Sequence, residues 1–151
     1  MNDHAATFAA VFAALYAAHQ VGDHWVQTDH DARHKGGPGW AGRRACASHV
    51  LSMTITKVVA LAALTIVTGL DTSPLWITIA LAVDAISHYW ADRRTTLAHL
   101  AALIPGKAGF YLLGRPREGH DDNPCLGTGA YALDQSFHVA FLFVAALIAT
   151  I

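Results

Sequence analysis

The sequence predicts an all-α protein, a single integral membrane domain over residues 1–151 that forms a four-helix transmembrane bundle. Three observations lead to this prediction. The chain is 54% hydrophobic and only 14% charged, whereas soluble proteins are typically about 45–50% apolar and about 25% charged. Its apolar residues form four long runs. Nine of its ten lysines and arginines lie in two blocks between those runs, at 33–44 and 93–117.

The four apolar runs place the predicted spans at about 5–26, 50–70, 74–92 and 134–151. A helix rises about 1.5 Å per residue, so crossing a hydrocarbon core of about 30 Å takes roughly 20 residues. No Lys or Arg precedes the first run, so we expect a spanning helix there rather than a cleaved signal peptide. A soluble four-helix bundle is the alternative, but it would need a charged outer face that these runs do not offer.

The basic residues also predict an orientation. Both blocks lie in long connections, whereas the N-terminus, the 69–73 connection and the C-terminus carry no Lys or Arg. The positive-inside rule therefore predicts a multi-pass protein of the inner (cytoplasmic) membrane with both termini outside. Segment 96–114, in the second cytoplasmic loop, is too short and too broken by Pro105 and Gly106 to span. It predicts an interfacial helix followed by an aromatic anchor.

Histidine and aspartate recur four residues apart near the cytoplasmic end of the predicted spans. The set comprises three such pairs and one further histidine that opens the second span: His19 with Asp23, Asp84 with His88, Asp134 with His138, and His49. Residues four apart lie on one face of a helix. The depth of these groups follows from the Lys and Arg positions and not from the pairs themselves, so their common depth is an independent indication of a shared polar site.

A bound cation would explain why these groups lie together. An ionisable residue inside a spanning helix costs roughly 2.5–3.5 kcal/mol on insertion scales, and imidazole with carboxylate is a ligand set for transition metals. The predicted metal ligands are His19, Asp23, His49, Asp84, His88, Asp134 and His138. Zinc is the first candidate and iron or manganese the next. The set suffices for two ions bridged by a carboxylate, or for one ion whose histidines are oriented by outer carboxylates. A proton-conducting or structural hydrogen-bond network is the alternative without a metal.

Several neighbouring polar residues admit two interpretations. Asp134 could simply cap the last helix. Asp92 lies one turn past His88, and we interpret it as a partner of Arg93 rather than as a ligand. Lys57 lies about two turns deeper than His49 and is expected either to pair with another buried group or to line a cavity leading from the site. Gln27 is a candidate outer amide.

Four stretches carry a resemblance to a known family: HQVGDHWVQT, the isolated His49, DAISHYWADRR and GTGAYALDQSFH. Together they resemble an uncharacterised family of short multi-pass membrane proteins from actinobacteria, other bacteria and phages, with HxxxD, H, DxxxH and DQxxH motifs. The resemblance covers nearly the whole chain. The chain is also distantly similar to small inner-membrane metal-dependent hydrolases, which implies hydrolysis only weakly.

The sequence thus favours a membrane-embedded, metal-dependent hydrolase that acts at the cytoplasmic interface on a lipid-linked or phosphorylated substrate, with catalytic roles for Asp23, Asp84 and Asp134. The alternatives are a di-metal redox enzyme, although such bundles use Glu and i,i+3 spacing, and an ion or proton transporter. The expected partners are membrane lipids, with anionic headgroups attracted to the basic loops, and a second copy of the chain to complete the cavity. No helix-turn-helix or basic recognition helix suggests a nucleic-acid partner.

Overall fold

The computed structural model describes residues 4–115, 118–119 and 127–151. Over these residues the protein is all-helical and contains no strand. Its elements are α1 (His4–Val21), a π-helical turn η1 (Gly22–Val26), α2 (Asp29–His34), α3 (Gly39–Thr68), α4 (Pro74–Asp92), α5 (Thr95–Leu103), α6 (Lys107–Leu112) and α7 (Gly129–Ile148).

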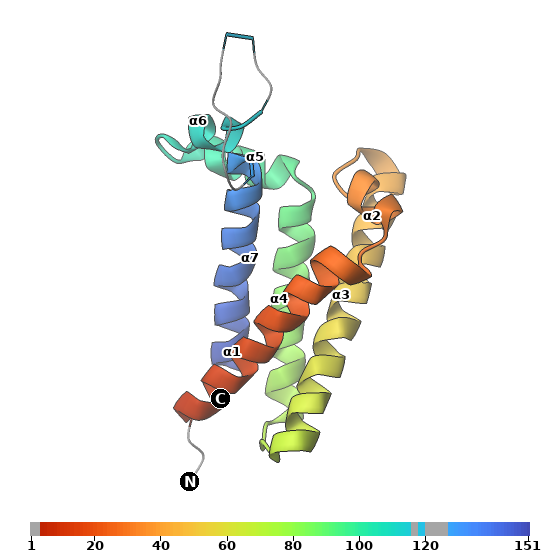
Figure 1. Cartoon of the computed structure of the whole chain (residues 1–151), viewed down its shortest axis with the longest axis vertical. Coiled ribbons are helices and arrows are strands. Elements are labelled where there is room, and N and C mark those ends of the chain that lie inside the picture. The colour runs from red at the N-terminus through yellow and green to blue at the C-terminus, as the bar shows by residue number, and fades with distance from the viewer. Residues whose placement is uncertain (1–3, 116–117, 120–126) are drawn as a thin grey trace.

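The four long helices α1, α3, α4 and α7 pack together. Helices α3, α4 and α7 run roughly along the long axis of the molecule, and α1 crosses them obliquely (Figure 1). Helix α4 packs most extensively against α7, and α1 contacts both α3 and α7. The two termini and the short α3–α4 connection lie at one end, while α2, α5 and α6 lie at the other. His4 Nδ1 lies 2.8 Å from the carbonyl oxygen of Thr150, which joins the start of α1 to the end of α7. Apart from Arg117, which lies outside the described residues, the two blocks of basic residues belong to the end that holds α2, α5 and α6.

Local signals explain where the helices begin and end. Helix α3 ends at Gly69, whose φ of 69° is a left-handed conformation that glycine adopts at little cost, and Pro74 begins α4. The hydroxyl of Thr128 accepts a hydrogen bond from the backbone N–H of Tyr131 and caps α7. Asp134 therefore lies inside α7 and does not cap it.

Two helices are longer than the spans predicted from hydropathy. Helix α3 begins at Gly39 rather than at 50, and α7 begins at Gly129 rather than at 134. The physical reason is that hydropathy detects the apolar part of a helix, whereas backbone hydrogen bonds continue through its polar end. In the second long connection, the chain forms two short helices, α5 and α6, which are separated at Pro105 and Gly106. Tyr111 of α6 is buried beside α5 and α7 rather than exposed as an anchor.

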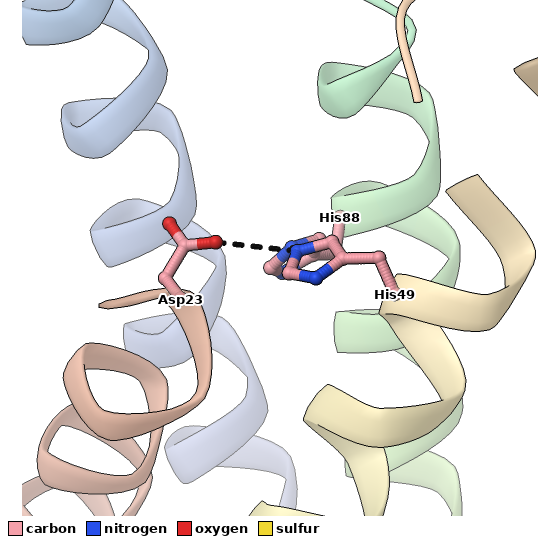
Figure 2. Close-up of side chains that lie close together, drawn as sticks. All are labelled: Asp23, His49 and His88. Carbon is pink, nitrogen blue, oxygen red and sulfur yellow. Dashed lines mark hydrogen bonds and ion pairs between the residues drawn. The ribbon is translucent and has the colours of Figure 1, made fainter. Parts of the chain in front are cut away.

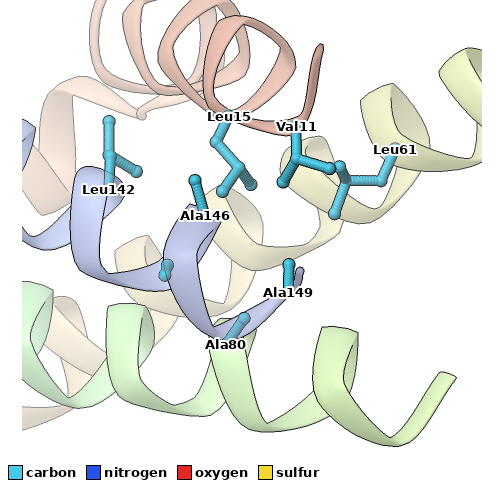
Figure 3. Close-up of a cluster of buried hydrophobic side chains, with 8 residues drawn as sticks. Val11, Leu15, Leu61, Ala80, Leu142, Ala146 and Ala149 are labelled. Atoms are coloured by element: carbon cyan, nitrogen blue, oxygen red, sulfur yellow. The ribbon is translucent and has the colours of Figure 1, made fainter. Parts of the chain in front are cut away.

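The apolar core lies at the end of the bundle that holds the termini. It consists of small and branched residues from all four long helices: Val11, Leu15, Leu61, Ala80, Leu142, Ala145, Ala146 and Ala149 (Figure 3). Ala80 of α4 and Ala145 and Ala146 of α7 belong to this core, and small residues allow two helix backbones to approach closely, as is usual between membrane helices. Toward the opposite end, the long helices also bury polar residues, among them His19, His49 and His88.

Three helical segments are long and apolar enough to span a membrane: His4–Val26, Gly39–Thr68 and Gly129–Ile148. Large apolar side chains also point outward along α3, among them Leu51, Ile55, Val59 and Ile66. An outer surface of this kind suits hydrocarbon rather than water. These properties indicate a membrane protein. Helix α4 is the fourth long helix of the bundle, but it carries three ionisable residues in 19, namely Asp84, His88 and Asp92.

Candidate metal centre

The polar interior lies at the end of the bundle opposite the apolar core, where η1 joins α3, α4 and α7. The π-helical turn of η1 directly extends α1 and places Asp23 toward the bundle interior. Its first residue, Gly22, lies so close to α3 that a Cβ atom there would overlap the Met53 side chain. Single π-helical turns are often found at functional sites because they redirect side chains without ending the helix.

Three ligand-type atoms from α3 and α4 form a closed triangle. His49 Nε2 lies 3.0 Å from His88 Nε2, and each of these nitrogens lies 3.2 Å from Asp92 Oδ2. On the η1 side, Asp23 Oδ1 lies 3.2 Å from His49 Nε2. Figure 2 shows the Asp23 carboxylate facing the His49 and His88 rings from across the bundle. The carboxylates of Asp23 and Asp92 therefore both lie 3.2 Å from His49 Nε2.

These separations match those of ligands that share an ion. Two donors at ~2.0–2.1 Å from a tetrahedral zinc lie ~3.3 Å apart, and the triangle has edges of 3.0, 3.2 and 3.2 Å. Two groups of donors, Asp23 with His49 and His88, and His88 with Asp92 and His138, each lie close enough together to hold a metal ion. The donor set therefore fits a transition metal in both chemistry and spacing.

Several buried polar atoms of this region lack a hydrogen bond. Within the described part of the chain they are Asp23 Oδ1, Asp92 Oδ2, His88 Nδ1, His138 Nε2 and both ring nitrogens of His19. An unsatisfied buried polar atom costs about 1–3 kcal/mol. A metal ion or water molecules at this place could satisfy several of these atoms at once.

A second set of donors continues on the α7 side. His138 Nε2 lies 3.7 Å from Asp92 Oδ1 and 3.5 Å from Asp134 Oδ1. The His19 ring lies beside the neighbouring rings of His88 and His138, at centroid distances of 5.4 and 5.1 Å, and those two rings are 4.1 Å apart. Asp92 therefore presents one oxygen to His49 and His88 and the other to His138. This is the arrangement of a carboxylate able to bridge two ions.

Outer groups orient the cluster. With its amide in the orientation that satisfies its neighbours, the Gln27 oxygen accepts hydrogen bonds from His49 Nδ1 at 3.2 Å and from Lys35 Nζ at 2.9 Å. A proton held on Nδ1 leaves the Nε2 lone pair of His49 free for a metal. Lys35 Nζ also lies 3.0 Å from Asp92 Oδ2 and 3.7 Å from Asp23 Oδ1. The expectation of Gln27 as an outer amide agrees with this geometry.

The structure brings together six of the seven ligands predicted from the sequence, and Asp92 lies in the cluster in place of the seventh, Asp84. His19, Asp23, His49, His88, Asp134 and His138 meet at the cluster. The Asp84 carboxylate instead accepts a hydrogen bond from Lys57 Nζ at 2.5 Å, one turn deeper in the bundle. Neither of the two candidate ligand groups contains Asp84. Lys57 thus has the buried partner that was one of its two predicted roles.

Asp92 lies in the middle of the cluster, and its interpretation as a partner of Arg93 is wrong. The Arg93 guanidinium donates instead to the carbonyl oxygens of Lys35 and Gly37, at 2.7 and 2.5 Å. Asp84 and Asp92 are each four residues from His88, so helical spacing alone supports either as its partner. The signal that could have found Asp92 is its position, because it lies at the polar end of the helix where the other motifs converge.

A cavity of about 440 Å³ adjoins the cluster on the side of the long connections. Its lining includes three carboxylates of the cluster region and three basic side chains: Asp23, Asp92 and Asp134, with Lys35, Arg94 and Arg115. Asp134 is 26% exposed, whereas Asp92 is 2% exposed. The cluster is therefore buried but reachable through this cavity.

The fold and the site together define a class of protein: an all-helical membrane protein with a buried cluster of histidine and aspartate at one end of its helix bundle. Residues 11–151 match the family described as "Protein of unknown function (DUF3307)", and the chain belongs to this family. The expectation of an uncharacterised family is thereby confirmed, while its occurrence in actinobacteria and phages stays a prediction. No curated protein and no solved structure matches the chain.

Proposed function

We propose that the chain holds one or two divalent transition-metal ions, zinc foremost and iron or manganese next, and acts as a metal-dependent hydrolase at a membrane surface. The observation that carries the proposal is the triangle of His49 Nε2, His88 Nε2 and Asp92 Oδ2, with edges of 3.0–3.2 Å. Asp23 completes a first ion site. His138 and Asp134, with the second oxygen of Asp92, would form another.

The proposed topology has four crossings, with α4 as the fourth, and both termini outside the cytoplasmic membrane. The two basic blocks lie at one end of the bundle and the termini at the other, as the positive-inside rule requires for this orientation. The ionisable residues of α4 turn inward and are buried, which removes the main obstacle to its lying in a bilayer. Helix α5 would then lie along the cytoplasmic surface.

Hydrolysis is the reaction that this donor set supports best. A zinc ion held by His and Asp would lower the pKa of a bound water toward neutrality and polarise a phosphoryl or acyl oxygen. Asp134 lines the cavity and is partly exposed, so it is placed to accept a proton from such a water. Asp84 is occupied by Lys57, and we assign it no role in the reaction.

Metal analysis of the full-length chain, purified without chelators, tests the proposal. We expect at least one equivalent of a transition metal per chain, and its loss in His49→Ala and Asp92→Asn. A matched control should keep the metal: His30→Ala, which removes an exposed histidine outside the cluster. A folded wild-type protein with far less than one equivalent of every transition metal would refute the proposal.

A redox enzyme is the second candidate, favoured by one observation. The two oxygens of Asp92 face two separate sets of donors, which is the geometry of a carboxylate-bridged pair of metals. Two iron ions with visible absorbance would support redox chemistry, and zinc would support hydrolysis.

A further inference from the structure

We propose that the cavity beside the cluster binds the phosphate group of a phosphate ester, and that Arg94 and Arg115 hold it. This inference rests on the proposed function, because it names the substrate class for the same site. Arg94 and Arg115 line this cavity together with Asp23, Asp92 and Asp134. A ligand in the cavity therefore lies between the two arginines and the proposed metal ligands.

The charges of the lining favour an anion once a metal is bound. The lining residues include three carboxylates and three basic groups, and these charges cancel. Lys35 already lies within 3.0–3.7 Å of Asp92 and Asp23. One divalent ion would then give the lining a net charge of about +2, and a second ion would raise it further. A phosphate monoester carries nearly two negative charges at neutral pH, so its charge complements the loaded site.

The backbone of Arg94 provides an independent observation. Arg94 is the one non-glycine residue with positive φ in the described part of the chain, at 57°. Side chains disfavour this region, and residues held there are concentrated at functional sites. Its side chain crosses Gly36 so closely that a Cβ atom on that glycine would lie 2.6 Å from Arg94 Cδ. Its guanidinium donates to the carbonyl oxygen of Ala32 at 3.0 Å, and Ala32 also lines the cavity.

Arg115 is held differently, by an aromatic ring. Its guanidinium carbon lies 5.5 Å from the centre of the Tyr111 ring, and Tyr111 is buried and also lines the cavity. Two guanidinium groups, one fixed by a backbone carbonyl and one stacked on a ring, provide several N–H donors. Planar guanidinium forks match phosphate oxygens well. Tyr131 and Thr128 add hydroxyl groups to the same lining.

The reaction implied is hydrolysis of the ester. The oxygen of water forms a new bond to phosphorus, and the bond from phosphorus to the alcohol oxygen breaks. One proton of the water passes to that oxygen, so an alcohol and inorganic phosphate result without an oxidant or reductant. The ester could belong to a lipid or to a soluble molecule. A small apolar cavity of about 180 Å³ shares Leu97 with the phosphate cavity and continues along Leu100, Ile104 and Phe137.

Titration of the zinc-loaded, full-length chain in phosphatidylcholine nanodiscs with inorganic phosphate tests the inference. We expect saturable binding by the wild type, and binding weaker by about tenfold or more in Arg94→Gln and Arg115→Gln. Arg33→Gln is the charge-matched control. Arg33 lies at the same end of the molecule but outside the cavity, where it pairs with Asp29, and its variant should bind like the wild type. Arg115 is exposed, so Arg115→Gln should fold even if Arg94→Gln does not.

Equal affinity in the wild type and all three variants, or no saturable binding by zinc-loaded wild type, would overturn the inference while leaving the metal site intact. A chain that holds no transition metal would refute the proposed function alone. In that case, phosphate binding that depends on Arg94 and Arg115 would still support the cavity assignment, and its absence would overturn it. Displacement of the bound phosphate by glycerol 3-phosphate would indicate a soluble ester. Displacement only by phosphatidic acid in the nanodisc would indicate a lipid ester. Displacement by neither would overturn the assignment to an ester.

Discussion

The buried ion pair between Lys57 and Asp84 offers the sharpest test of the packing. The Lys57 side chain is 0% exposed and that of Asp84 is 5% exposed, and Nζ lies 2.5 Å from Oδ2. Removing one partner of such a pair leaves an uncompensated buried charge and costs about 3–5 kcal/mol, whereas replacing both with apolar residues is often neutral or stabilising. We therefore expect Asp84→Leu and Lys57→Met each to lower the free energy of unfolding by about 3–5 kcal/mol.

The double variant should recover most of that loss. Its free energy of unfolding should lie near or above that of the wild type, so the coupling energy in a double-mutant cycle should exceed about 3 kcal/mol. The assay is reversible unfolding of the full-length chain in mixed micelles by SDS titration. Asp29 and Arg33 provide a matched control, because their ion pair is 2.9 Å long but 76% and 73% exposed. The same cycle there should give less than about 1 kcal/mol.

A coupling below about 1 kcal/mol at Lys57–Asp84 would refute the reasoning, since it would place this pair in the range of exposed salt bridges. Metal content supplies a second readout. The double variant should retain the metal, because Asp84 lies with Lys57 rather than with the histidines. Loss of the metal from a folded double variant would instead indicate that Asp84 is a metal ligand.

Two further predictions concern the backbone and the topology. Gly42→Ala should lower the free energy of unfolding by about 1–3 kcal/mol, because the new Cβ atom would overlap the Gly37 carbonyl group. Gly109→Ala is the control. Its Cβ atom would meet nothing within 4 Å, so this variant should be neutral or slightly stabilising in the same unfolding assay. Thr72→Cys in a Cys46→Ser, Cys125→Ser background should react with an impermeant thiol reagent added outside intact cells, because Thr72 lies in the connection at the end of the bundle that holds the termini. Labelling only after access from the cytoplasmic side would reverse the proposed orientation.

Much of the site could be predicted from spacing and depth. Pairs at i,i+4 had to lie on one helix face, and the Lys and Arg distribution indicated that the polar groups of four separate segments lie at one level. The structure brings His19, Asp23, His49, His88 and His138 together. Periodicity could not decide between Asp84 and Asp92. Both stand one helical turn from His88, in opposite directions along α4.

The helix boundaries show a similar division. The apolar runs predicted long apolar helices, because hydrophobic length is a property of the sequence. They did not give the starts of α3 and α7, where helical hydrogen bonding continues through polar residues and stops at caps such as Thr128. The π-helical turn at Gly22–Val26 was also not predictable, because it depends on how η1 approaches Met53.

The sequence by itself determined that this is a helical protein with three or more segments fit for a membrane, with its charges at one end and its histidines and aspartates near that end. Hydrophobic length, charge distribution and helical period are local quantities, and they suffice for this. Only the tertiary structure decided which carboxylate joins the histidines and which joins Lys57. That choice depends on the axial stagger of α3 against α4: the cluster end of α4 lies level with His49, and Asp84, one turn deeper than His88, lies level with Lys57.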